Sequence, residues 1–93
     1  GRQFYRSATS IGANISEGQS AQSTRDFISK FKIAHKEALE TKFWLNQIQN
    51  ILSDESLKEF SNKLRSVTYM LNKSIATATN KIKDQNPKRS RKP

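Results

Sequence analysis

Apolar residues recur at steps of three and four along the start of the chain, which is the spacing of an amphipathic α-helix. The apolar positions of this first run are Phe4, Ala8, Ile11 and Ile15. Gly18 follows the run, and glycine is common immediately after the last residue of a helix, where the backbone turns left-handed. The pattern therefore predicts a first helix over residues 3–17 that ends at Gly18.

Two longer helices follow. The apolar positions of the second are Phe27, Phe31, Ala34, Ala38, Leu45, Ile48 and Leu52. Those of the third are Leu57, Phe60, Leu64, Val67, Leu71, Ile75, Ala78 and Ile82. We predict helices over residues 24–52 and 54–83. The N-cap of the former is Ser23 or Thr24, and that of the latter is Ser53 or Asp54. Short connections make successive helices antiparallel.

These lengths leave part of the core without a cover. At 1.5 Å per residue, the first helix reaches about 25 Å, whereas the second and third each reach roughly 42–45 Å. Their heptad spacing is typical of bundles that pack at about 20°. No stretch alternates with the two-residue period of a strand. The predicted fold is an all-α, antiparallel up-down four-helix bundle in which three helices are visible.

Apolar residues also occur beside the main stripe of the second helix. On one flank they are Ile33, Trp44 and Ile51, and on the other Ile28, Leu39 and Phe43. A helix that is apolar on several sides is usually buried by several neighbours. Two interpretations remain open: a wide core face, or a surface that is covered by a missing helix or by another subunit of a homo-oligomer.

The chain of 93 residues carries a net charge of +9. Residues 86–93 are polar, basic and interrupted by proline, so we expect a disordered tail behind a helical domain over residues 1–85. Basic rows can neutralise phosphates without reading bases, although they can also be solvated surface. The candidate phosphate contacts are Arg2, Arg6, Arg25, Lys32, Lys36, Lys88, Arg89, Arg91 and Lys92.

The sequence gives no support for an enzyme, a metal site or a cofactor. There is no cysteine, and His35 is the single histidine, without a second ligand at metal spacing. The three glycines fit no phosphate-binding loop. No apolar run has the roughly 18 residues of a membrane span and no signal peptide is present, so we expect a cytoplasmic protein with no membrane contact.

Residues 6–18 read RSATSIGANISEG, and the pattern continues at residues 23–27 (STRDF), Phe31, Ala34 and residues 39–41 (LET). This combination resembles the bacterial four helix bundle proteins known as the 23S rRNA intervening sequence protein family. Gly12 stands where that family has proline, and Ser16 where it has alanine. Because glycine and proline are both poor helix formers, position 12 is a candidate for a kink or a close neighbour.

The resemblance implies a non-enzymatic bundle that assembles into rings, often pentamers, and whose first helix is absent from this chain. It also points to the accessory variability determinants of diversity-generating retroelements, which bind nucleic acid and a reverse transcriptase. The motif residues Ser10, Asn14, Glu17 and Gly18 have two interpretations. They are a binding site, or, as we favour, polar groups that bond across helices and fix the turn before Gly18.

Two functions follow. The first is an oligomer that binds nucleic acid, RNA more than DNA, through basic surfaces. The second is a protein scaffold or accessory subunit, for example for a reverse transcriptase, whose charge only keeps it soluble. Salt separates them, because binding through phosphates weakens steeply as ionic strength rises and an apolar interface hardly changes.

Overall fold

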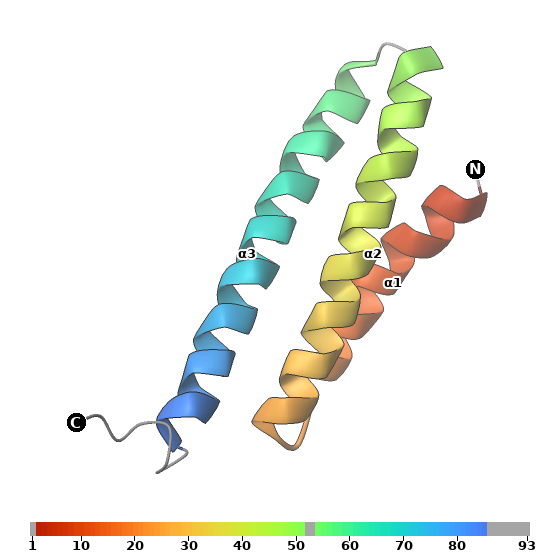
Figure 1. Ribbon diagram of the computed structural model, residues 1–93. Helices are drawn as coiled ribbons and strands as arrows, with labels where there is room; N and C mark the ends of the chain where they lie inside the picture. Colours follow the sequence, from red (N-terminus) through yellow and green to blue (C-terminus); the bar gives the residue numbers. More distant parts are fainter. Residues whose placement is uncertain (1, 52–53, 86–93) are drawn as a thin grey trace.

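The computed structural model describes residues 2–51 and 54–85, which form three antiparallel α-helices (Figure 1). Helix α1 spans Arg2–Gln19, α2 spans Thr24–Ile51 and α3 spans Glu55–Gln85. Every helix end lies within two residues of its prediction, and the described part of the chain contains no strand. The all-α fold class is therefore confirmed, and a fourth helix stays a prediction.

Side-chain caps start the two longer helices. The backbone N–H of Asp26 donates to Ser23 Oγ at 3.1 Å, so Ser23 is the N-cap of α2. The N–H of Ser56 donates to Asp54 Oδ1 at 2.9 Å, which makes Asp54 the cap of α3. Each cap satisfies one of the N–H groups that a first helical turn leaves without a partner.

Gly18 does not end α1 in the predicted way. The helix continues through it to Gln19, and no described glycine has a positive φ. Gly18 is instead buried against the ring of Phe31 in α2, where an added Cβ would lie 2.6 Å from Phe31 Cδ1. The absence of a side chain is thus required by the close approach of two helices and not by a left-handed turn. At Gly12, by contrast, an added Cβ would meet nothing within 4 Å.

Helix α2 lies between the other two helices and supplies most of the core. The buried apolar residues are Ile11, Phe31, Ala34, Ala38, Leu45, Leu64, Leu71 and Ala78. No Cα of α1 comes within 8 Å of a Cα of α3. The rings of Phe4 and Phe60 still meet edge to face, with their centroids 5.5 Å apart. The molecule is flat and elongated, with extents of 56 × 26 × 15 Å.

The corner between α1 and α3 is open. A hollow of about 560 Å³ lies there, between the end of α1, the start of α2 and the second half of α3. Phe27 and Ala78 line it, and Phe27 is only half-buried. The hollow lies at the end of the bundle where α1 joins α2, whereas the helix lengths predict an uncovered core at the opposite end, which α1 does not reach. The missing cover at that end stays a prediction.

The six apolar flank residues of α2 lie elsewhere, and none of them lines this open corner. Trp44 is half-buried and lines a hollow of about 240 Å³ with Phe4 and Ile51, where the start of α1 meets the end of α2. Ile28 is half-buried beside α3. The four remaining flank residues are exposed: Ile33, Leu39, Phe43 and Ile51. A subunit interface on these residues stays a prediction.

Candidate nucleic-acid interface

The polar side chains on α1 make their hydrogen bonds mainly within the helix itself. Ser7 is fully buried, and its Oγ donates to the carbonyl of Gln3 at 2.8 Å. The Asn14 amide donates to the carbonyl of Ser10 at 2.9 Å. Of these motif residues, Glu17 is the one that reaches another helix in the described structure, where it pairs with Lys30 at 2.8 Å. Asn14 therefore bonds within α1 and not across helices, and its acceptor is the backbone carbonyl of Ser10.

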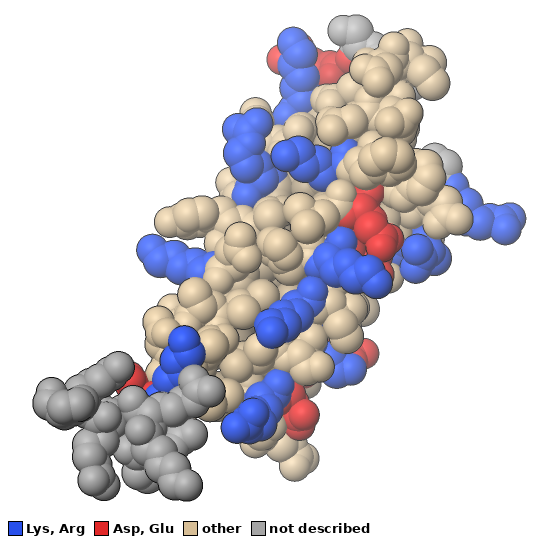
Figure 2. All heavy atoms as spheres, viewed as in Figure 1, with Lys and Arg blue, Asp and Glu red and all other residues tan. Residues whose placement is uncertain are grey.

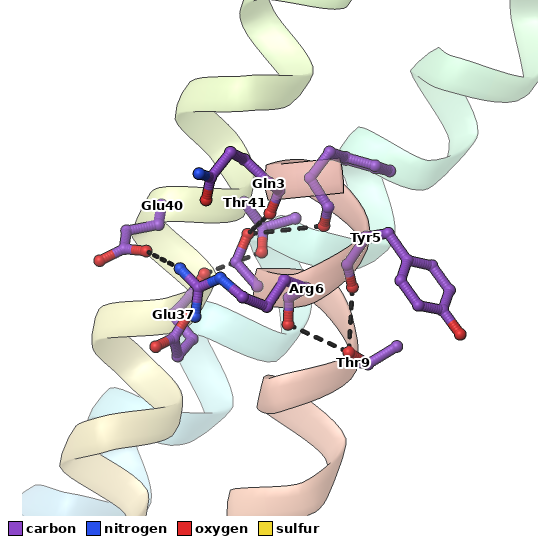
Figure 3. A network of polar contacts seen from close by, with 9 residues as sticks. Gln3, Tyr5, Arg6, Thr9, Glu37, Glu40 and Thr41 are labelled. Atoms are coloured by element: carbon purple, nitrogen blue, oxygen red, sulfur yellow. Dashed lines mark hydrogen bonds and ion pairs between the residues drawn. The ribbon is translucent and has the colours of Figure 1, made fainter. Parts of the chain in front are cut away.

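The side of α2 that faces α1 carries two carboxylates, those of Glu37 and Glu40, and the ammonium group of Lys30. Arg6 reaches from α1 to Glu40 at 3.7 Å, and Glu37 lies one turn earlier on the same side (Figure 3). Lys30 donates a hydrogen bond to Glu17, which raises the pKa of Lys30 above 10.5 because the carboxylate favours the charged ammonium. These two pairs are the ion pairs of residues 2–51 and 54–85, and both join α1 to α2.

The side of α2 that meets α3 carries cations. Arg25 and Lys32 line a hollow of about 600 Å³ together with Lys83 from the end of α3. The hydroxyls of Ser29 and Thr79 belong to the same lining. Arginine and lysine side chains with hydroxyl groups beside them are the usual donors to phosphate oxygens.

A second hollow, of about 220 Å³, lies further along the same two helices. Its cations are Lys42 and Arg65, and its exposed apolar side chains are Leu39 and Tyr69. The two hollows lie on one face because their residues follow a helical repeat: Arg25, Lys32 and Leu39 are seven residues apart. We call these two hollows together the α2–α3 groove.

No carboxylate lines either hollow of the α2–α3 groove. In the described part of the chain, none of its five cations forms an ion pair. Figure 2 shows Lys and Arg side chains spread over α2 and α3, with fewer Asp and Glu among them. The groove is thus a positive surface whose charge is available to a negatively charged ligand.

The predicted phosphate contacts divide into three groups. Arg25 and Lys32 line the groove, and Lys36 is exposed and lies one helical turn beyond Lys32. Arg2 and Arg6 lie on α1, away from the groove, and Arg6 is engaged by Glu40. The remaining four, Lys88, Arg89, Arg91 and Lys92, lie outside the described residues.

Sequence reasoning missed the contribution of α3, which is Arg65, Thr79 and Lys83. A signal was present, because Arg65 and Lys83 are 18 residues apart, which is five complete helical turns. No cluster of metal-ligating side chains occurs among residues 2–51 and 54–85, and His35 is half-buried. No described helix has the length and hydropathy needed to span a membrane.

Fold and surface define a small helical protein with a basic groove between two of its helices. The model of the 23S rRNA-intervening sequence protein family matches residues 1–73, and the chain belongs to that family. A crystal structure of a protein of unknown function from the S23 ribosomal protein family of Bacteroides thetaiotaomicron is similar. It is 41% identical, with a TM-score of 0.75, and the match covers 80% of this chain and 70% of that one. No curated protein matches the chain.

Proposed function

We propose that this protein binds nucleic acid without catalysis, and that the α2–α3 groove is the main contact surface on its helices. The observation that carries the proposal is the separation of charge on α2. Glu37 and Glu40 lie on the side that faces α1, whereas three cations of α2, Arg25, Lys32 and Lys42, line the groove. There α3 adds two more cations, and neither lining includes a carboxylate. A row of unpaired cations along one face matches the repeated charge of a phosphate backbone. The family to which the chain belongs is named after an intervening sequence of 23S rRNA, and this association favours RNA over DNA as the ligand.

Salt dependence tests the proposal. The affinity of a protein for nucleic acid falls with salt by a log–log slope of about 0.7 per phosphate contact for a single strand and about 0.9 for B-DNA. Replacing Lys32 and Lys83 by Gln removes one groove cation from each helix. We expect weaker binding to all sequences in a filter-binding titration, and a slope that is flatter by roughly 1.4 on single strands.

Lys63→Gln with Lys81→Gln is the matched control. Both lysines are exposed on α3 and lie outside the groove, so this variant has the same net charge as the test variant. An equal loss of affinity in both variants would mean that net charge alone determines binding. A third variant lacks residues 86–93. If this deletion abolishes binding and the groove substitutions have no effect, the groove is not the interface.

Assembly into a homo-oligomer, with a pentamer more probable than a dimer, is the second part of the proposal. Each copy presents only a modest basic surface, and linking several copies raises the effective concentration of each site for a long polyanion. The exposed apolar side chains of α2 that lie outside the groove, Ile33, Phe43 and Ile51, supply a surface for such assembly. Burying a large apolar side chain is worth about 1.5–3 kcal/mol.

Exposed apolar side chains of α2 also favour the alternative function, a scaffold for another protein such as a reverse transcriptase. Phe43 and Leu39 are each about half exposed. If they bind a protein, that complex will persist through half-molar salt, whereas a complex held by phosphate contacts will dissociate. Alanine replacement of Phe43 would weaken the protein complex and leave the salt slope of RNA binding unchanged.

A further inference from the structure

The two hollows of the α2–α3 groove differ in chemistry. The first offers Arg25, Lys32 and Lys83 with two hydroxyls, which is a surface for phosphate oxygens. The second combines two cations with apolar side chains, and Tyr69 is 66% exposed there. A ring that is two-thirds exposed adds little to the core of its own subunit, and Tyr69 instead lines the groove.

An aromatic side chain beside cations is the arrangement that grooves for single-stranded nucleic acid use, because every base has a face that can stack. Lys73 Nζ lies over one face of the Tyr69 ring, 5.7 Å from its centre, and adds a third positive charge, so a base would stack on the opposite face. Leu39 in the facing helix provides an apolar wall. A duplex keeps the faces of its bases stacked inside the helix and exposes only their edges, sugars and phosphates, so it offers no base face to the Tyr69 ring.

We propose that the α2–α3 groove binds single-stranded nucleic acid, with phosphates at Arg25, Lys32 and Lys83 and an unpaired base stacked on Tyr69. The inference rests on the proposed function and adds the class of ligand. Lys83 and Tyr69 are 14 residues apart, or about 21 Å along α3, which a few nucleotides of an extended strand can span. One short strand can therefore occupy both hollows at once.

The test compares three probes of equal length, about 12 nucleotides, which lies within the span of known single-strand grooves. They are an unstructured RNA, an abasic phosphodiester chain and a blunt RNA duplex. Fluorescence anisotropy with the intact protein measures each affinity. We expect the RNA to bind about 5- to 150-fold more tightly than the abasic chain, which is the range for stacking of one base.

Tyr69→Ala should remove that advantage and leave binding of the abasic chain unchanged. Tyr5→Ala is the control, since Tyr5 is equally exposed but lies on α1. Equal affinity of the wild-type protein for RNA and the abasic chain would overturn this inference and leave the proposed function standing. Tighter binding of the duplex, or a loss of abasic binding in Tyr69→Ala, would overturn it as well. Failure to bind any probe at low salt would overturn the proposed function itself.

Discussion

Replacing Gly18 by Ala should destabilise the protein, against the usual effect of this change in a helix. Ala is favoured over Gly within helices by roughly 0.5–1 kcal/mol. At position 18, however, the new Cβ would lie 2.6 and 2.7 Å from two atoms of the Phe31 ring. That ring is 3% exposed and stacks on Phe27 at 4.1 Å, so it has little room to move. Overpacking of this kind costs about 1–3 kcal/mol.

Gly12→Ala is the matched control, because its Cβ would enter open space on the same helix. To first order the gain in helix propensity is common to both variants, so the difference between them isolates the overpacking cost of about 1–3 kcal/mol. For a chain of this size each kcal/mol shifts Tm by about 4–8 °C. Thermal melts followed by circular dichroism measure the difference. If Gly18→Ala raises Tm as much as Gly12→Ala does, the contact with Phe31 does not constrain position 18.

Three further predictions concern the cap, an ion pair and assembly. Ser23→Ala removes the N-cap of α2 and should cost about 1 kcal/mol in chemical denaturation, whereas Ser66→Ala on the exposed face of α3 should cost nothing. The Lys30 pKa is raised by Glu17, so the pair stabilises the protein below pH 10.5 and loses its effect as pH rises through the folded pKa. Denaturation of Glu17→Gln at several pH values should therefore show a deficit that disappears in strong alkali. Sedimentation velocity of the intact protein at micromolar concentration should show an oligomer, and a monomer would contradict the proposed assembly.

The helices could be predicted from the sequence because the features that determine them involve residues close together along the chain. Apolar spacing gave the three elements, and Ser23 and Asp54 marked two of their starts through short-range hydrogen bonds. Each of these features depends on residues within one or two turns of each other. The same is true of the basic face of α2, where Arg25 and Lys32 share one side by their spacing alone.

What could not be predicted depends on how helices meet. A glycine near the end of a helix fits either a left-handed turn or a close approach, and only the position of Phe31 decides between them for Gly18. Likewise, the sequence alone could not show that Trp44 lies near the start of α1, where it and Phe4 line one hollow. Arg65 and Lys83 are two of many basic residues in the sequence. The structure shows that both line the groove, because α3 packs beside α2.

The position of α2 between the other two helices has a consequence for how the molecule opens. Since α1 and α3 are each held by α2 and share little beyond the contact of Phe4 with Phe60, either can separate while the remaining pair stays packed. Release of α3 would break the α2–α3 groove but leave the α1–α2 hairpin and both of its ion pairs intact. A ligand that bridges α2 and α3 binds only while the two helices are packed together. It therefore lowers the population of the form in which α3 is released, and amide hydrogen exchange in α3 slows accordingly.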